Sequence, residues 1–284
     1  MPLTFVERIP FTYPSGAQTL HANFHADASG FYFASNGHVR VFDADGTRQS
    51  GSDIELKNHP AADTIWGFTK TTNSQWATLT RDSGIGIIGT IRLYDETGTQ
   101  QRVANVPDVI TGINQVSNPW RAPKALVEVG GNFYVRVVRA VSGNMRLVKF
   151  DSTLDVQDDD LVINNANPTA LSDAASNGIE NILIIQQRQS IVYGIKASDA
   201  TIVSNLQTDL DSRNTEGYAA SIDGQYLYVA DRGAYIYKYS GVPEEESKSP
   251  TSGGGSGGMF TIFHLAQINA MYGRDLRNKR RRQR

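Results

Sequence analysis

The sequence predicts an all-β fold made of four-stranded sheets that repeat along the chain. Residues 1–241 of the 284 contain short runs in which apolar and polar residues alternate, and these runs are rich in Val, Ile, Tyr, Phe and Thr. Turn residues separate the runs, and no segment with the period of an amphipathic helix lies between them. Similar strand endings recur about every 45 to 55 residues, the length of one propeller blade. We therefore expect a β-propeller with five four-stranded blades in residues 1–241.

The first element that the sequence predicts is a strand over residues 3–11 (LTFVERIPF). A ring of blades closes only when its first and last blades are joined, because each sheet must bury both faces against its neighbours. This strand is placed to complete the blade that ends near Tyr239. The sequence therefore predicts that the first strand of the chain pairs with the last sheet.

The repeated strand ending is clearest in three places. Residues 39–46 (VRVFDADG), 91–98 (IRLYDETG) and 145–151 (MRLVKFD) each run from a strand into an acidic turn. Residues 190–196 (SIVYGIK) and 235–240 (YIYKYS) are weaker copies. A four-stranded sheet cannot bury both of its faces alone, so we expect these units to stack around a common axis.

The last repeat contains the clearest hairpin. In residues 221–230 (SIDGQYLYVA), Asp223 and Gly224 signal a two-residue turn, because a type I′ turn needs residues that tolerate positive φ. Residues 222–233 (IDGQYLYVADRG) resemble the DGxYLYVA blade of YVTN/lactonase-type and WD40-like propellers, and residues 39–46 share the Asp-x-x-Gly ending of that superfamily. The resemblance implies the propeller architecture. It does not carry over the lactonase activity, because lactonase-type propellers have more blades than this chain has room for.

The composition changes after Gly241. Residues 242–258 are acidic and then rich in Pro, Ser and Gly, which predicts a flexible linker. A Gly/Ser run followed by Met is also typical of an engineered fusion joint. Residues 259–284 predict an amphipathic helix with a basic C-terminal tail. The predicted helix carries an apolar stripe made of Ile262, Phe263, Leu265, Ile268, Met271, Tyr272 and Leu276.

The basic tail divides the chain into two electrostatic parts. Seven basic residues stand there against one acid, Asp275: Arg274, Arg277, Lys279, Arg280, Arg281, Arg282 and Arg284. The tail is therefore +6 and the remainder −8, because the whole chain has 27 basic and 29 acidic residues. We expect the stripe and these basic residues to dock on protein subunits of an assembly, as a helix in a groove. The same charges suit nucleic acid phosphates or an anionic membrane, and a solvated extension is the alternative.

The composition and the N-terminal sequence exclude several kinds of site and narrow the expected location of the protein. No cysteine occurs, which excludes disulfides, thiolate metal sites and cysteine nucleophiles. The N-terminus lacks the basic and apolar regions of a signal peptide, and no apolar run is long enough to span a membrane. We therefore expect the protein in the cytoplasm or in a virion.

Three sequence patterns suggest a metal site, and each has a simpler explanation. His21, His25 and Asp27 include two histidines, but four residues of strand place the imidazoles roughly 13 Å apart, too far for one ion. Residues 43–46 (DADG) begin like a calcium loop, yet the later ligands are missing and a hairpin turn accounts for them. Residues 158–160 (DDD) suit a cation or a solvated loop. We expect no metal and no cofactor.

A hydrolase needs two carboxylates on opposite sides of a pocket. Five acids are candidates for lining a propeller channel: Asp63, Asp82, Glu128, Glu180 and Glu216. Nothing in the sequence pairs any two of them. No Gly-x-Ser-x-Gly nucleophile elbow occurs, and residues 84–89 (GIGIIG) match a dinucleotide fingerprint poorly. We therefore expect no catalytic residues.

Three tryptophans are candidates for stacking on sugar rings: Trp66, Trp76 and Trp120. Large aromatic residues in propellers also fill the wedge between blades, which is the simpler explanation. The sequence as a whole favours a non-enzymatic structural or interaction subunit of a larger assembly, such as a virion or phage tail, docked through its C-terminal segment. The alternatives are a carbohydrate-binding propeller and, less favoured, a lactonase-like or glycosidase-like hydrolase.

Overall fold

The computed structural model gives the arrangement of most of the predicted strands. It describes residues 3–12, 23–60, 63–81, 89–106, 124–138, 145–163, 171–176, 181–186, 191–207, 219–223, 226–230 and 235–241. All of them lie in one compact unit, Met1–Glu245. The predicted linker over residues 242–258 and the predicted helix and basic tail over residues 259–284 lie outside the described residues, so they stay predictions.

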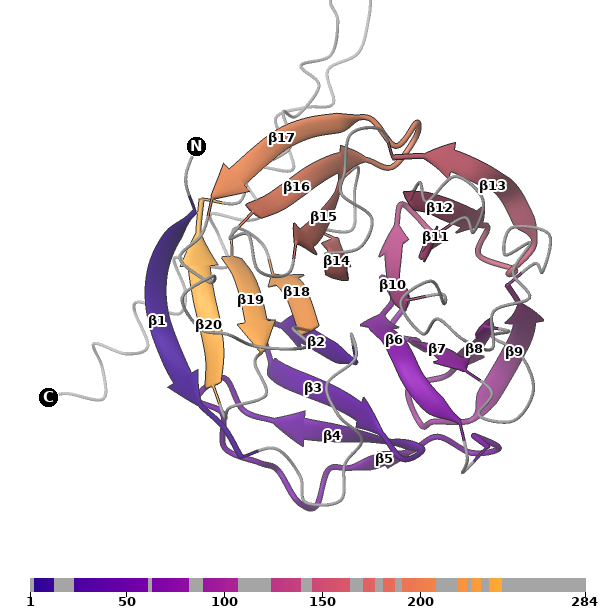
Figure 1. The fold of residues 1–284 in the computed structure, drawn as a ribbon. Coiled ribbons are helices and arrows are strands. Elements are labelled where there is room, and N and C mark those ends of the chain that lie inside the picture. The colour runs from indigo at the N-terminus through magenta and orange to yellow at the C-terminus, as the bar shows by residue number, and fades with distance from the viewer. Residues whose placement is uncertain are drawn as a thin grey trace, which may run out of the picture. The chain divides into compact units, whose positions relative to one another are not determined.

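The described strands form five four-stranded antiparallel sheets (Figure 1). The first sheet contains β2 (Phe24–Asp27), β3 (Gly30–Ser35), β4 (His38–Phe42) and β5 (Ile54–Glu55). The second contains β6 (Thr64–Lys70), β7 (Trp76–Arg81), β8 (Gly89–Tyr94) and β9 (Gln100–Asn105). The third contains β10 (Lys124–Val129), β11 (Asn132–Val138), β12 (Met145–Phe150) and β13 (Val156–Val162). The fourth contains β14 (Leu171–Ser176), β15 (Asn181–Gln186), β16 (Ile191–Lys196) and β17 (Ile202–Gln207). The fifth contains β18 (Ala219–Asp223), β19 (Tyr226–Ala230), β20 (Tyr235–Ser240) and β1 (Thr4–Pro10).

The five sheets close into a ring around their innermost strands. The strand of each sheet that lies nearest the centre of the ring is β2, β6, β10, β14 or β18 (Figure 1). Each of them contacts the innermost strand of the next sheet, and β18 contacts β2. The prediction of an all-β propeller is therefore confirmed.

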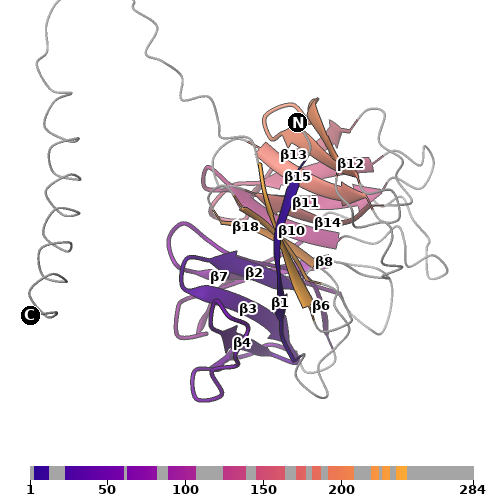
Figure 2. The same ribbon diagram turned by 90° about the vertical axis from the view of Figure 1, so that its left-hand side faces the viewer.

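The first strand of the chain completes the last sheet, as the sequence predicts. β1 pairs antiparallel with β20, with Thr4 opposite Ser240 and Pro10 opposite Tyr235. Figure 2 shows β1 running beside the orange strands of that sheet. The Arg8 guanidinium lies 4.2 Å from the centre of the Tyr235 ring, a cation–π contact across the same pair of strands. Closure therefore joins two segments that are more than two hundred residues apart in sequence.

The alternation that predicts strands also explains where the core lies. In β3, Phe31 and Phe33 pack in a cluster with Tyr228 of the fifth sheet, whereas Tyr32 and Ala34 pack in a cluster shared with the second sheet. None of these four β3 residues is more than 8% exposed. Successive side chains of a strand point to opposite faces, so one strand supplies core on both sides. Each sheet is therefore a wedge between two neighbours.

The repeated strand ending is a turn organised by one carboxylate. Asp95 Oδ1 accepts hydrogen bonds from the backbone N–H groups of Thr97 and Thr99, at 3.0 and 2.9 Å. The Gln101 side-chain amide donates to Asp95 Oδ2 at 2.9 Å. These donors hold the pKa of Asp95 below its ordinary value, the Thr97 hydroxyl contributing most. The carboxylate thus satisfies backbone donors that the turn leaves free.

Two further turns use the same chemistry. Asp151 Oδ1 accepts from the backbone N–H groups of Thr153 and Asp155, and the Gln157 amide donates to Asp151 Oδ2 at 3.0 Å. In the turn over residues 43–46, the Gln49 amide donates to Asp43 in the corresponding way. The hairpin-turn interpretation of residues 43–46 is therefore confirmed.

Candidate functional site

Charged side chains gather where the innermost strands end. β2 ends at Asp27 and β6 at Lys70, and the Lys70 Nζ lies 2.8 Å from Asp27 Oδ2. Glu128, next to the end of β10, accepts hydrogen bonds from the backbone N–H and the hydroxyl of Thr72, at 2.8 and 2.9 Å. β18 ends at Asp223, which is close enough to Asp27 for the charge of Asp27 to act on its ionisation. The ends of β2, β6, β10 and β18 therefore lie on one side of the ring, and we call Asp27, Lys70, Glu128 and Asp223 the rim site.

The alternation of β2 places its polar residues at this site. Phe24 and Ala26 are buried, at 1% each, and pack toward the fifth sheet. His25 and Asp27 alternate with these residues along the strand. Their side chains lie on the opposite face, toward Tyr32 and Lys70. β2 therefore turns an apolar face toward the fifth sheet and a polar face toward Tyr32 and Lys70.

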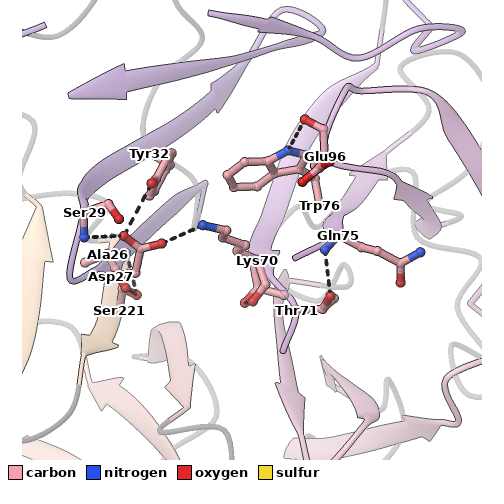
Figure 3. A network of polar contacts seen from close by, with 11 residues as sticks. Ala26, Asp27, Ser29, Tyr32, Lys70, Thr71, Gln75, Trp76, Glu96 and Ser221 are labelled. Carbon is pink, nitrogen blue, oxygen red and sulfur yellow. Dashed lines mark hydrogen bonds and ion pairs between the residues drawn. The ribbon is translucent and has the colours of Figure 1, made fainter. Parts of the chain in front are cut away.

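Asp27 is the most heavily hydrogen-bonded carboxylate of the rim site (Figure 3). Its Oδ1 accepts from the backbone N–H of Ser29 at 2.8 Å and from the Tyr32 hydroxyl at 3.4 Å, while Lys70 donates to Oδ2. Burial opposes the charge, yet Lys70 and Ser29 hold the pKa of Asp27 below its ordinary value. Burial also works against the charge of Lys70, but the bond to Asp27 holds the Lys70 pKa above its ordinary value. Both groups are therefore charged at neutral pH.

Two aromatic rings cover the Lys70 ammonium. Its Nζ lies 5.0 Å from the centre of the Tyr32 ring and 5.4 Å from that of Trp76. Rings at this distance attract a cation through their quadrupoles. The Lys70 side chain, 25% exposed, is therefore held in one place by a carboxylate and two rings.

His25 contributes an uncharged imidazole to the same seam. Its ring centre lies 6.1 Å from that of Tyr32. Burial lowers the pKa of His25 from 6.5 to about 4, with Asp27 opposing and Lys70 adding to that effect. The imidazole is therefore neutral at physiological pH. Among the described residues, no group of three or more His, Asp or Glu side chains is placed to hold a metal ion. His21 lies outside them.

Asp223 behaves in the opposite way to Asp27. Burial raises the pKa of the half-buried Asp223 carboxyl, and the negative charge of Asp27 raises it further, against an opposing effect of Lys238. The causes that act on the Asp223 pKa among the described residues include no hydrogen bond, whereas Lys70 and Ser29 donate to Asp27. Two aspartates of one site therefore have pKa values displaced in opposite directions.

Two of the three predicted stacking tryptophans, Trp66 and Trp76, lie among the described residues. Trp76 is 3% exposed, and its ring stacks on Phe68 with 5.6 Å between centres and an interplanar angle of 11°. Its indole N–H donates to the Glu96 carbonyl at 3.4 Å. This burial favours the wedge-filling explanation over sugar stacking for Trp76. Trp66 lies half-buried in β6, and Trp120 lies outside the described residues.

Two of the five predicted channel carboxylates, Asp63 and Glu128, lie among the described residues. Glu128 belongs to the rim site, whereas Asp63 pairs with Arg92 at 3.3 Å in a buried ion pair. Residues 158–160, expected in a loop, lie instead in β13, an outermost strand of the third sheet where Asp158 is exposed to solvent. Asp82, Glu180 and Glu216 lie outside the described residues.

Sequence reasoning misses Lys70 and, as a charged group, Asp223. The sequence marks Asp223 only as a turn residue, and Lys70 belongs to no motif. Their shared signal is position, because each is the last residue of an innermost strand.

Within the described ranges, no helix has the length and apolar character needed to cross a membrane.

Comparison with known proteins names no family. No family model and no curated protein matches the chain. The crystal structure of Myxococcus xanthus glutaminyl cyclase is 9% identical over 84% of this chain and 97% of that chain, with a TM-score of 0.49. A catalytically inactive virginiamycin B lyase from Staphylococcus aureus, crystallised with quinupristin, is 9% identical over 77% of this chain and 80% of that chain, with a TM-score of 0.39.

These comparisons correct the predicted function. The sequence favours a non-enzymatic structural subunit of a virion or phage tail, whereas the solved structures that resemble the chain include two enzymes. At this identity the likeness concerns the fold, so neither activity is transferred. A propeller can bring strand ends together that no contiguous motif reveals, so the absence of a catalytic motif in the sequence does not argue against an enzyme. The docking of residues 259–284 and the predicted location are untested and stay predictions.

Proposed function

We propose that the chain is an enzyme that performs acid–base catalysis at the rim site. The observation that carries this proposal is the placement of Asp27, paired with Lys70 at 2.8 Å, and of the half-buried Asp223 at the ends of neighbouring innermost strands, surroundings that displace their pKa values in opposite directions. Two carboxyl groups whose surroundings push their pKa values apart are suited to different roles in one reaction. Asp27 is the permanently charged member, and Asp223 is the member that keeps a proton to higher pH.

Asp223 is the general acid in this proposal. A group whose pKa is raised toward the working pH donates a proton more effectively than an ordinary carboxylic acid that is already ionised. Its half-buried position, next to the charge of Asp27, raises the pKa of the carboxyl above its ordinary value. Asp223 would protonate a leaving group or an oxygen that gains negative charge.

The Asp27–Lys70 pair orients the substrate. It presents a fixed positive and a fixed negative charge 2.8 Å apart at the rim, each side chain 25% exposed. With Asp223 protonated, the charges of the rim site are the carboxylates of Asp27 and Glu128 against the ammonium of Lys70, and Lys238 acts on Asp223 from β20, so the site has no large excess of either sign. We therefore propose a small polar substrate without a large net charge.

The test is a product screen over many compounds, because the site defines only the class of the substrate. The purified full chain is incubated with pools of small polar compounds, amines and amides among them, and new masses are recorded by mass spectrometry. We expect at least one product whose rate of formation falls about 100-fold or more in Asp223→Asn. Asp199→Asn is the matched control, because Asp199 is an exposed carboxylate in the turn after β16. Equal rates in wild type and Asp223→Asn for every product, or no product in any pool, would contradict the proposal.

A further inference from the structure

One serine ties together the two strands that carry the coupled aspartates. The Ser221 hydroxyl accepts a hydrogen bond from the Ala26 backbone N–H at 2.8 Å and donates to the Ala26 carbonyl at 3.4 Å (Figure 3). Ala26 directly precedes Asp27, and Ser221 stands two residues before Asp223. Ser221 is 5% exposed and Ala26 is 1% exposed, so both ends of the bond are shielded from water.

This bond crosses the seam at which the ring closes. β18 and β2 belong to the fifth and first sheets and share no β-ladder, since β18 pairs with β19 and β2 pairs with β3. Apolar packing across this seam fills space but fixes no register. A buried hydrogen bond does fix one, because sliding the strands would leave the Ala26 N–H without its partner in an apolar region.

We propose that Ser221 is a positioning residue, whose hydroxyl sets the separation between Asp27 and Asp223 across the seam between β2 and β18. The proposal rests on the function proposed above for the use of the two aspartates, whereas the effect of the hydroxyl on the pair is measurable without a substrate. The Coulomb interaction between two charges weakens as the distance between them grows, and it is stronger where water is excluded. The bond between Ser221 and Ala26 lies two residues from Asp223 and one residue from Asp27. It therefore controls closely the distance between their carboxyl groups.

The other charged groups near Asp223 define what else acts on it. Lys238 of β20 opposes the effect of Asp27, and Asp223 in turn acts on the ionisation of Tyr228 in β19. Tyr226 stands opposite Asp223 in the ladder between β18 and β19. Lys70 neutralises part of the Asp27 charge from the β6 side. None of these groups depends on the Ser221 hydroxyl for its own strand pairing, so a Ser221 substitution chiefly changes the relation between β2 and β18.

The experiment follows the side-chain carboxyl of Asp223 by carbon-13 NMR through a pH titration of the full chain. In Ser221→Ala we expect the Asp223 midpoint to move down toward the ordinary value of an aspartate, because water enters the seam and Asp27 recedes. Ser221→Thr keeps a hydroxyl at the same place and should restore the wild-type midpoint. Ser240→Ala is the matched control, because the Ser240 hydroxyl makes a 3.5 Å bond to the Thr4 carbonyl between two paired strands of one sheet and so crosses no seam between sheets.

Three results would overturn the proposal. An unchanged Asp223 midpoint in folded Ser221→Ala is one, and an equal shift in Ser240→Ala is another. If Ser221→Ala does not fold, Ser221→Cys replaces it, since a thiol keeps the side chain while donating and accepting more weakly. An unchanged midpoint in folded Ser221→Cys is the third.

Two further measurements separate this proposal from the proposed function. Asp27→Asn should lower the Asp223 midpoint in the wild-type background, which tests the coupling itself. Where the screen yields a product, the basic limb of its pH–rate profile should move to lower pH in Ser221→Ala, a change that a merely structural serine would not produce. A shifted midpoint with no product in any pool supports Ser221 as a positioning residue while contradicting the enzyme. A product whose formation needs Asp223 but not Ser221 supports the enzyme while contradicting Ser221 as a positioning residue.

Discussion

Neighbouring donors decide whether each aspartate of the rim site is held charged or protonated. Asp27 receives hydrogen bonds from Lys70 and Ser29 that outweigh the cost of burial, while Asp223 bears that cost together with the repulsion of Asp27. Sequence alone does not separate the two, because both stand at a strand end before a short turn that contains glycine. What distinguishes them is Lys70, which reaches Asp27 from another sheet.

The Asp27–Lys70 pair should contribute pH-dependent stability. The pKa of Asp27 is lower in the folded protein than in the unfolded chain. Its ionised form therefore stabilises the fold above the unfolded value, and this contribution is lost as the pH falls through the folded value. In urea unfolding at pH 7 we expect Asp27→Asn to lower the free energy of unfolding by about 1 kcal/mol, and the difference from wild type should shrink in acid.

The control for this measurement is another lysine–aspartate pair of the same chain. Lys196 and Asp199 lie 4.0 Å apart with side chains 50% and 52% exposed, and water screens such a pair. Asp199→Asn should therefore leave the urea midpoint nearly unchanged at pH 7. An Asp27→Asn effect that stays constant from neutral to acid pH would show that packing, rather than charge, is responsible.

At the scale of one element, the turn over residues 95–99 explains why the repeat is visible in sequence. Asp95 organises the backbone of the turn, and Gly98 has φ +80° with its α-carbon against the first sheet. A β-carbon on Gly98 would stand 1.9 Å from the Glu55 carbonyl oxygen. The third copy of the turn carries Leu154 at this position with φ +67°, so positive φ alone does not require glycine here. The close approach of another sheet does.

Two glycine substitutions separate these causes. Gly98→Ala should lower the free energy of unfolding by roughly 2 kcal/mol or more, because it combines positive φ with a backbone clash. Gly131→Ala has a similar φ, +79°, and no atom within 4 Å of the added carbon, so it should cost only about 1 kcal/mol. Thermal and urea unfolding of both variants checks the difference. Equal losses would mean that φ alone sets the cost.

At the scale of the whole molecule, the sequence predicts the architecture better than the site. Alternation, turn residues and the repeated ending are local patterns, and they identify the propeller and the pairing of the first strand with the last sheet. The rim site combines Asp27, Lys70, Glu128 and Asp223, which no local pattern links. Only closure of the ring brings them together.

Closure also predicts how the chain responds to shortening at either end. Removing residues 1–11 deletes β1 and leaves the β20 edge unpaired, with Ile9 and Phe11 lost from the core cluster at the seam. We expect this variant to lose cooperative thermal unfolding, or to melt well below the full chain. Ending the chain after Glu245 removes none of the described strands, so its melting temperature should match that of the full chain within about 2 °C. A cooperative, unshifted transition without residues 1–11 would contradict the role of β1.

The pairing of β1 with β20 has a consequence for how the protein is made. Thr4–Pro10 is translated more than two hundred residues before its partner Tyr235–Ser240. During most of synthesis the opening segment therefore waits without its ladder, while the sheets behind it emerge in order. A contact of such long range is slow to form and exposed to misassembly, so we expect β1 to pair with β20 after the local pairings within the other sheets have formed.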